Sequence, residues 1–285
     1  MTKLREAVLL EMRLRGLSPR TNESYIHALE ELAGYYWRPL ESLTCGEVQD
    51  FLDHLITGRK LAWSTVNVYF SAFRFLYEQV LGRPKNEFSI PRRGRSGKRP
   101  GILSKDEVKK LIDAPRRIKH RTLLAVVYGC GLRVSEAVRV RPRHIDRGRG
   151  MLFVECGKGR KDRYTILPDR ALDMLGDHWR ENGPFEYFFY GCDKSRPMAV
   201  GTAQSVYRQA LERSGVRRVG GIHVLRHCFA THLMEAGADI YTIRRWMGHH
   251  RLSTTGRYMH VTAETIRNTT SPLDMLDELC ERSKR

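Results

Sequence analysis

Hydrophobic positions near the start of the chain recur at helical spacing, three or four residues apart, between short polar stretches. Helix-start signals precede three of these patterns: Ser18 stands before Pro19, Thr44 forms a capping box with Glu47, and Ser64 precedes the third. The apolar positions expected to face a core are Tyr25, Ile26, Leu29 and Leu32, then Val48, Phe51, Leu52 and Leu55, then Val68, Ala72, Phe75 and Leu76. The pattern predicts an all-α domain of four helices over residues 1–90.

A stretch rich in Pro, Gly and Arg, PRRGRSGKRP at residues 91–100, interrupts the helical pattern. This composition cannot form a stable helix, so we predict an interdomain linker over residues 91–102. Ser104 and Glu107 have the spacing of a second capping box, which marks the first helix of a further domain. We therefore place a second domain over residues 103–285.

Most of the second domain shows helical periodicity, but one stretch has a strand pattern. MLFVEC at 151–156 and RYTILP at 163–168 are rich in β-branched and apolar residues, and GKGRKD between them reads as a turn, so we predict a β-hairpin. Helices are expected at about 169–180, 202–214, 223–236, 240–247 and 262–270, followed by a short amphipathic segment at 271–285. The predicted fold class is mainly α, with a small antiparallel hairpin or sheet in the second domain.

Charge is unevenly distributed in this chain of 285 residues, whose formal net charge is +18. Residues 1–90 carry no net charge, residues 91–100 carry five basic residues and no acidic one, and residues 101–285 carry 34 Lys and Arg against 21 Asp and Glu. Such a surplus indicates a polyanionic partner, and nucleic acid is the leading candidate. No apolar run approaches the roughly 20 residues of a membrane span, and the charged N-terminus lacks the apolar core of a signal peptide. We therefore expect a cytoplasmic protein with no membrane partner.

Motifs for common cofactors and metals are missing from the sequence. There is no GxxxxGK[ST] loop, and GKGRKD is not the GxGxxG of a dinucleotide site. The six cysteines form no CxxC pair. His223 and His227 are one helical turn apart but lack the Glu of HExxH, and Arg226 beside them would repel a cation. We predict no cofactor and no metal site.

The second domain instead carries a set of cationic and hydrogen-bonding side chains at the ends of predicted elements. The set comprises Arg133 after two glycines, Lys158 in the hairpin turn, His223 and Arg226 one turn apart on a helix, His249 after a helix-ending glycine, and Tyr258. A phenol with a pKa of about 10 is a poor nucleophile unless cationic groups stabilise its anion or its target. The surrounding cations make Tyr258 a candidate nucleophile.

Four stretches resemble the tyrosine recombinases, the family of phage integrases, Xer dimer resolvases and transposon-linked recombinases. They are GCGLRVSEAV, GKGRKDRYTILP, HVLRHCFATHLMEAGADIYTIRRWMGHHRLSTTGRYMHV and, more loosely, LSPRTNESYIHALEEL in the first domain. The resemblance covers almost the whole chain and keeps the order and spacing of the family's motifs. The likeness is greatest to the Xer-like branch of phage and transposon enzymes. The insertion that integron integrases carry before the HxxR box is absent, which argues against the integron branch.

The resemblance implies a site and a role for each member. The catalytic residues would be Arg133, Lys158, His223, Arg226, His249 and Tyr258, with Glu136 as a supporting carboxylate. Tyr258 would be the nucleophile, His223 the general base and Lys158 the general acid. The two arginines and His249 would bind the phosphate oxygens, while Glu136 would orient the cations around it. Candidate DNA contacts are Arg92, Arg93, Arg95, Lys98 and Arg99 in the linker, with Arg160 and Lys161 in the hairpin turn.

The resemblance further implies a site-specific DNA recombinase, associated with a mobile element, that needs neither metal nor ATP. Strands would be cleaved and rejoined through a 3′-phosphotyrosyl intermediate and exchanged through a Holliday junction. An N-terminal SAM-like core-binding domain and the catalytic domain would close as a C-shaped clamp around double-stranded DNA with an inverted-repeat core site. The protein would be largely monomeric when free and would form a homotetramer on two DNA sites, with residues 271–285 as the exchanged segment.

Two alternatives stay open at this point. A type IB topoisomerase shares the same Arg, Lys, His and Tyr chemistry but acts as a monomer, and the amphipathic segment after Tyr258 argues for an assembling protein instead. A DNA-binding regulator of transposition without catalytic activity is the other alternative. The complete set of catalytic positions argues against it.

Overall fold

The computed structural model of the chain describes residues 3–84, 88–90, 101–155, 162–217 and 219–248. It contains two compact units, Met1–Lys98 and Arg99–Arg285, each with a hydrophobic core of its own. Several predicted features lie outside the described residues: the basic stretch 91–100, the hairpin turn at 156–161, the helix at 262–270 and the segment 271–285.

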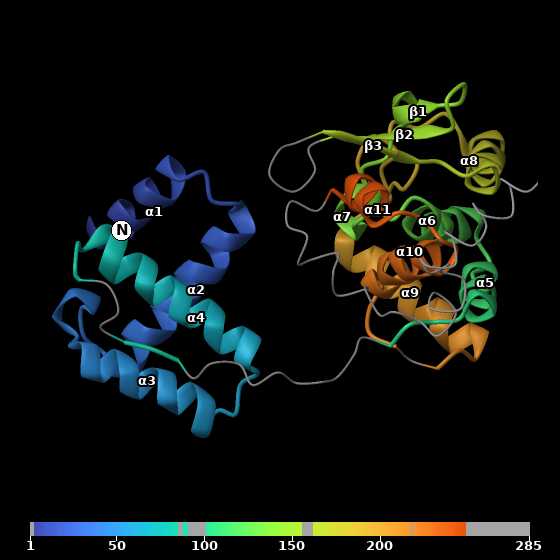
Figure 1. The fold of residues 1–285 in the computed structure, drawn as a ribbon. Coiled ribbons are helices and arrows are strands. Elements are labelled where there is room, and N and C mark those ends of the chain that lie inside the picture. Colours follow the sequence, from blue (N-terminus) through green and yellow to red (C-terminus); the bar gives the residue numbers. More distant parts are fainter. Residues whose placement is uncertain (1–2, 85–87, 91–100, 156–161, 218, 249–285) are drawn as a thin grey trace, which may run out of the picture. The chain divides into compact units, whose positions relative to one another are not determined.

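The first unit is built from four α-helices, as the hydrophobic pattern predicted (Figure 1). They are α1 (Lys3–Leu14), α2 (Pro19–Tyr36), α3 (Cys45–Thr57) and α4 (Trp63–Arg74), with a 3₁₀ turn at Leu40–Ser42 and a π-helical turn, Phe75–Val80, that continues α4. Two of the predicted caps are confirmed. Ser18 accepts a hydrogen bond from the backbone of Thr21 at 3.2 Å, and Thr44 and Glu47 form the reciprocal capping box.

The third predicted cap and one predicted core position in this unit are wrong. Helix α4 begins at Trp63, and Ala62 precedes it without a side-chain cap, so Ser64 lies inside the helix. Val68 is 37% exposed, because the buried stripe of α4 runs through Val66, Tyr69 and Phe73. Val68 stands one residue before Tyr69, about 100° around the helix axis, at the margin of that stripe. The other predicted core residues are buried or packed against the core.

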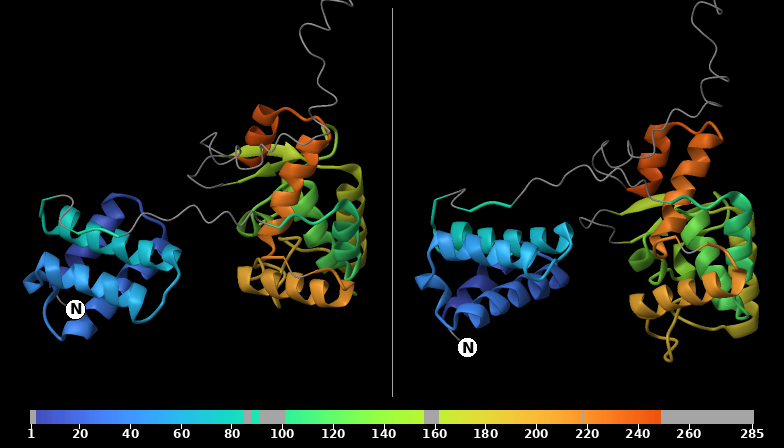
Figure 2. Two further views of the ribbon diagram at one scale, coloured as in Figure 1. Left: turned by 60° about the horizontal axis from the view of Figure 1, so that its bottom comes forward. Right: turned by 90° about the horizontal axis from the view of Figure 1, so that it is seen from below.

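The second unit is mainly helical, with a small sheet at one end (Figures 1 and 2). Its helices are α5 (Lys105–Asp113), α6 (Ile118–Gly129), α7 (Val134–Ala137), α8 (Asp169–Asn182), α9 (Val200–Ser214), α10 (His223–Glu235) and α11 (Ile240–Met247). Residues 122–127 of α6 are all buried, so this helix is apolar on every side and packs against α5, α8, α9 and α10. Apart from the helix at 262–270, the predicted helices are confirmed to within two residues at their ends.

The predicted hairpin is confirmed and belongs to a three-stranded antiparallel sheet of order β1-β2-β3. Strand β2 (Met151–Val154) pairs with β3 (Arg163–Ile166) in a register that sets Val154 opposite Arg163. Strand β1 (Ile145–Asp146), which the sequence did not predict, pairs with the other edge of β2.

The beginning of the second unit is hydrogen bonded to α10. The backbone N–H of Leu103 donates to the Cys228 sulfur at 3.4 Å, and the Leu103 carbonyl accepts from Nε2 of His232 at 3.0 Å. Since Nε2 donates, Nδ1 of the neutral ring accepts from the Tyr128 hydroxyl, 2.9 Å away. Burial lowers the pKa of His232, which favours this neutral ring. Ser104 follows directly and forms the predicted capping box with Glu107.

No helix in the described part of the chain has the length and apolar content needed to cross a membrane.

Candidate active site

Arg133 stands at the start of the short helix α7, after a tight glycine turn. Gly131 has a φ of +61°, and a Cβ atom there would lie 2.4 Å from the ring of Phe229 on α10. Only glycine combines this left-handed backbone with so close an approach of two segments. The turn brings Arg133 beside α10, with its side chain 20% exposed. The predicted place of Arg133, at a helix start behind two glycines, agrees with the structure.

Glu136 is a buried carboxylate surrounded by arginines, with its side chain only 6% exposed. Arg133 donates to it twice, from the backbone N–H at 2.9 Å and from Nη1 at 2.7 Å. Arg163 of β3 donates with both terminal nitrogens, at 3.0 and 2.7 Å. Burial alone would raise the pKa of Glu136, but the ion pairs with Arg163 and Arg133 outweigh it and lower the pKa to about 2. The carboxylate is therefore ionised and holds the cations around it.

Arg226 lies one turn into α10 and is buried, with 5% of its surface exposed. Its guanidinium donates from Nη1 to the Gly131 carbonyl and from Nη2 to the Met247 carbonyl, both at 2.5 Å. Nη1 also lies 3.8 Å from the Glu136 carboxylate. Arg226 thus joins the glycine turn, the end of α11 and Glu136.

His223 is the first residue of α10, one turn before Arg226 as the sequence predicted. Its side chain is at the surface of the unit. Partial burial lowers its pKa, and the positive charges of Arg226 and Arg133 lower it further, while Glu136 has the opposite effect. A lowered pKa favours the neutral imidazole at neutral pH, the form that can accept a proton.

Arg163 is a member of this cluster that the sequence analysis did not single out. It belongs to the stretch GKGRKDRYTILP, in which Arg160, Lys161 and Arg163 look alike as basic residues near a turn. The strand pattern contains one usable signal: Arg163 shares a face of β3 with the buried Thr165. A charged residue on a core-facing position of a strand indicates a buried partner.

The structure brings together four of the seven predicted catalytic positions. Arg133, Glu136, His223 and Arg226 meet where α7 and α10 approach the end of α11. Lys158, His249, Tyr258 and the seven predicted DNA contacts lie outside the described residues. Among the residues that are described, no three His, Cys, Asp or Glu side chains are grouped as metal ligands. Three guanidiniums around one carboxylate instead leave an excess of positive charge, which suits an anion.

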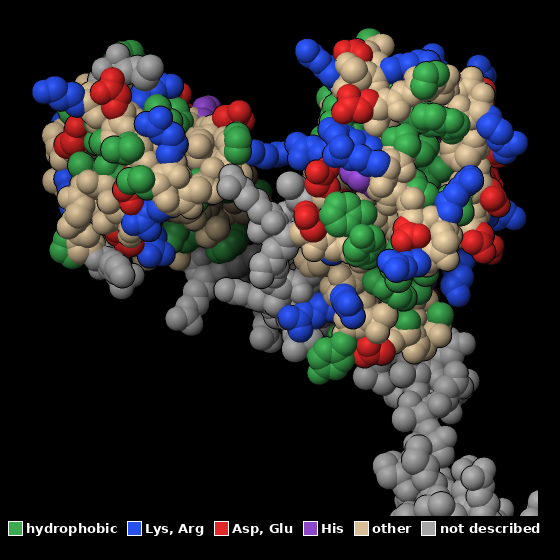
Figure 3. Space-filling model, turned by 90° about the horizontal axis from the view of Figure 1, so that it is seen from above, with side chains coloured by type: hydrophobic (Ala, Val, Ile, Leu, Met, Phe, Trp, Pro, Cys, Tyr) green, Lys and Arg blue, Asp and Glu red, His purple; other side chains and the backbone are tan. Residues whose placement is uncertain are grey.

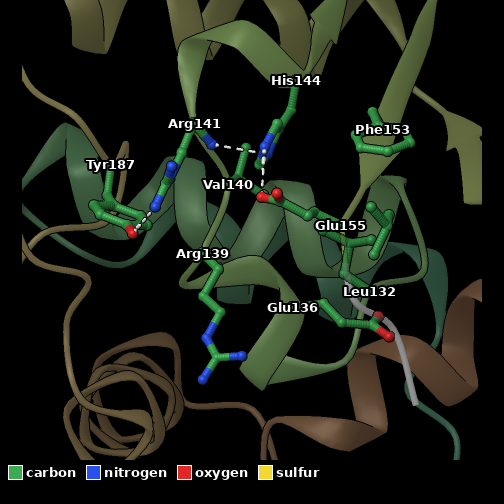
Figure 4. Close-up of a pocket in the computed structure, with 10 residues that line it drawn as sticks. Leu132, Glu136, Arg139, Val140, Arg141, His144, Phe153, Glu155 and Tyr187 are labelled. Carbon is green, nitrogen blue, oxygen red and sulfur yellow. Dashed lines mark hydrogen bonds and ion pairs between the residues drawn. The ribbon is translucent and has the colours of Figure 1, made fainter. Parts of the chain in front are cut away.

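Glu136 also lines a pocket of about 250 Å³, together with Arg139, Arg141, His144, Glu155 and Tyr187 (Figure 4). His144 is buried there, accepts from the backbone N–H of Arg141 at 3.2 Å, and lies 3.4 Å from Glu155. The guanidinium of Arg141 stacks 4.3 Å from the ring centre of Tyr187. In Figure 4, Arg139 points away from the His144–Glu155 pair, so the polar groups of this pocket do not converge on one point.

The surface of the second unit is rich in cations (Figure 3). In that view, Lys and Arg side chains are spread over the face among hydrophobic, Asp and Glu side chains. Three exposed arginines, Arg143, Arg147 and Arg149, lie around the first strands of the sheet. The excess of Lys and Arg over Asp and Glu in residues 101–285 is what a protein that binds a polyanion is expected to have.

Comparison with known families gives two matches that together cover most of the chain. Residues 102–265 match the family described as phage integrase, and residues 4–87 match the phage integrase N-terminal SAM-like domain. The chain is 33% identical over 279 residues to a putative integrase/recombinase, y4qK, of Sinorhizobium fredii. The aligned region covers 97% of this chain and 90% of that protein. It is 31% identical over 276 residues to the tyrosine recombinase XerA of Thermococcus kodakarensis, with 93% of each chain covered.

Solved structures share the fold. The XerH site-specific recombinase bound to palindromic difH substrate, in a post-cleavage complex, superposes with a TM-score of 0.71 at 22% identity, over 91% of this chain and 82% of that one. The Tn1549 transposon integrase in complex with circular intermediate DNA gives a TM-score of 0.72 at 15% identity, over 94% and 98%. At these identities the likeness concerns the fold, and it includes both units.

Proposed function

The chain belongs to the phage integrase family and is a tyrosine recombinase, and from this we propose that it cleaves and rejoins DNA at a specific site through a covalent bond to Tyr258. The observation that carries the proposal is the cluster in which Arg133 and Arg226 share Glu136. Two fixed guanidiniums can hold the phosphate of a scissile strand while its charge grows during attack.

The buried carboxylate explains how two arginines can serve one phosphate. Glu136 binds each of them from the protein side, so their remaining N–H groups are oriented by a fixed partner. Arg133 is the more accessible of the two, and its Nη2 makes a long contact of 3.5 Å with the Gly248 carbonyl. Such preorganised donors stabilise a transition state without rearranging during the reaction.

The proposed cleavage step balances without a cofactor. The Tyr258 oxygen attacks the phosphorus, its proton passes to His223, and the bond from phosphorus to the 5′-oxygen breaks. Lys158 protonates that leaving oxygen, which gives a 3′-phosphotyrosyl strand and a free 5′-hydroxyl. Attack by the 5′-hydroxyl of another strand reverses the step, so the phosphodiester energy is conserved and ATP is not consumed. The neutral state favoured at His223 supports its role as the base.

Double-stranded DNA is the proposed partner, in agreement with the excess of Lys and Arg in residues 101–285. The relatives of known structure include a lambda integrase dimer bound to a core site and the XerH complex with its difH substrate. By analogy, we assign this chain an inverted-repeat core site and a tetramer on two such sites. Both units would clamp the duplex, with DNA contacts from Arg92, Arg93, Arg95, Lys98, Arg99, Arg160 and Lys161. Strand exchange then runs through a Holliday junction.

A nicked suicide substrate tests the proposal directly. Loss of the short strand after cleavage prevents religation, so a functional enzyme accumulates a covalent protein–DNA adduct that survives denaturing electrophoresis. We expect such an adduct on the cognate core site and not on a scrambled duplex. Absence of any adduct, or relaxation of supercoiled DNA with equal efficiency on plasmids with and without the site, would contradict site-specific recombination.

A further inference from the structure

Three arginines close the C-terminal turn of α11 by donating to three successive carbonyl groups. Nε of Arg163 donates to the Trp246 carbonyl at 2.8 Å, Nη2 of Arg226 to that of Met247 at 2.5 Å, and Nη2 of Arg133 contacts that of Gly248 at 3.5 Å. The last carbonyls of a helix lack partners within the helix and carry the negative end of its dipole. Cations at this position therefore satisfy the helix end and fix its place.

The same three guanidiniums converge on Glu136 from their other side. Arg163 and Arg133 bind its carboxylate at 2.7–3.0 Å, and Arg226 lies 3.8 Å away. One carboxylate from α7 and one helix end from α11 are thus held in a single network. Buried networks of this kind are stable only when every member is satisfied.

Arg163 differs from the other two arginines in how completely the protein uses it. Both of its terminal nitrogens face Glu136, its Nε is on α11, and its side chain is only 10% exposed. Its aliphatic stem lies against Gly248, where a Cβ atom would be 2.9 Å from Arg163 Cδ. The accessible Arg133 can turn donors toward a substrate, whereas Arg163 has its three kinds of N–H directed into the protein.

We infer that Arg163 is a positioning residue for strand cleavage, which holds Glu136 in place behind the phosphate-binding arginines and fixes the end of α11. The inference rests on the proposed function. Gly248 is the last residue of the helix end that Arg163 holds, and His249 and Tyr258 follow it in the sequence. Arg163 also begins β3, five residues after Lys158. The Arg163 guanidinium therefore fixes the Glu136 carboxylate. Arg163 also contacts or begins the two segments, α11 and β3, whose sequence neighbours are the proposed nucleophile and the proposed acid.

Removing Arg163 leaves Glu136 with one partner fewer. Among the described residues, Arg133, Arg226 and His223 are charged or titratable groups that remain near its carboxylate. Arg133 would then be drawn toward Glu136 and away from a bound phosphate, so the chemical step suffers more than DNA affinity. Lysine cannot replace Arg163, because a single ammonium cannot bind a carboxylate in two places and reach the Trp246 carbonyl as well.

The test compares R163K and R163M with R170M, which removes an exposed arginine whose partner Asp113 is 3.5 Å away. Affinity for the core duplex and the single-turnover rate of adduct formation on a saturating suicide substrate are measured for each variant. We expect R163K and R163M to bind within about threefold of wild type and to cleave roughly 100-fold more slowly, as for other misplacements of about an ångström. R170M should match wild type in both measurements.

A double-mutant cycle with E136Q shows whether Arg163 acts through Glu136. If it does, E136Q/R163M cleaves about as slowly as the slower single variant, because both changes remove one unit. The inference would be overturned if the rate losses of the two single variants multiplied in the double variant, or if R163M cleaved at the wild-type rate. It would also be overturned if weaker DNA binding explained the rate loss, or if R163K did not unfold in a cooperative transition. Failure of the wild type itself to form an adduct would instead contradict the proposed function.

Discussion

Gly131 and Arg226 stand 95 residues apart in the chain and are joined by a hydrogen bond of 2.5 Å from the guanidinium to the glycine carbonyl. This hydrogen bond therefore ties the turn that places Arg133 to α10, the helix that carries His223. Its geometry depends on a backbone that L-residues with side chains rarely adopt, since Gly131 has a φ of +61°.

Replacing Gly131 by Ala should destabilise the second unit and misplace Arg133. The new methyl group meets the Phe229 ring at 2.4 Å in a left-handed backbone, so we expect a loss of about 2–4 kcal/mol in the free energy of unfolding. Denaturant unfolding measures it. G201A is the matched control, because nothing lies within 4 Å of a Cβ atom at that helical position. G131A as stable as G201A would show that the turn can relax.

Tyr258→Phe should abolish the covalent adduct and leave DNA affinity unchanged, since only one hydroxyl is lost. Electrophoresis of the suicide-substrate reaction and a gel-shift titration measure the two effects. Tyr241→Phe is the control, because Tyr241 is a 64% exposed tyrosine on α11. Chelation of divalent metals should not change the wild-type rate. An adduct formed by Tyr258→Phe would assign the nucleophile to another residue.

Lys158→Ala should be rescued by a substrate with a 5′-bridging phosphorothiolate, because the departing thiolate needs no proton. Arg133→Ala should not be rescued, because its charge acts on the non-bridging oxygens. Single-turnover rates on the oxygen and sulfur substrates give the ratio for each variant. If the ratio of the rates on the sulfur and oxygen substrates were the same for both variants, Lys158 would not be the general acid.

Glu136→Gln should lower stability in a pH-dependent way. The pKa of Glu136 in the folded protein is about 2, below its ordinary value of 4.5, so its ionised form stabilises the fold above the ordinary value and this contribution is lost as the pH falls toward 2. Wild type should exceed E136Q by something on the order of 3 kcal/mol near pH 6, and the difference should shrink by about pH 3.

Denaturant unfolding at several pH values measures that difference. Asp113→Asn provides the comparison, since the Asp113–Arg170 ion pair is exposed and should contribute little at any pH. A difference between wild type and E136Q that is independent of pH would mean that the charge of Glu136 is not what stabilises the cluster.

Deleting residues 271–285 should spare binding to a single core site and abolish the complex of two sites. The segment combines Leu273, Met275, Leu276 and Leu279 with acidic residues, an amphipathic pattern suited to docking on another protomer. Analytical ultracentrifugation with one and two DNA sites distinguishes the two complexes, and the free protein should sediment as a monomer. Recombination by the truncated chain at the wild-type rate would place the exchanged element elsewhere.

The sequence predicted those elements whose signals are local. The capping boxes at Thr44 and Ser104 and the glycine that ends α11 act within a few residues, so they can be recognised without the fold. Strand β1 was not predicted, because a strand of two residues shows no hydrophobic periodicity. Val68 was misplaced because an apolar residue at the margin of a helix stripe fits the period almost as well as one at its centre.

The sequence predicted most residues of the described cluster, but not the hydrogen bonds and ion pairs between them. Arg133, His223 and Arg226 stand at recognisable element ends, whereas the role of Arg163 depends on the meeting of β3 with α7 and α11. The strand face that Arg163 shares with Thr165 indicates a buried partner, but it does not identify a carboxylate 27 positions earlier or a carbonyl 83 positions later. Such relations arise only when the tertiary structure is formed.

The hydrogen bonds of Leu103 to Cys228 and His232 have a mechanical consequence. Both hydrogen bonds go to α10, the helix that also carries His223 and Arg226 in its first turn or two. A shift of the chain at Leu103 would therefore either break these two hydrogen bonds or move α10. Among the described arginines Arg226 is the most buried, so the bonds of Leu103 attach the beginning of this unit to the helix that holds it.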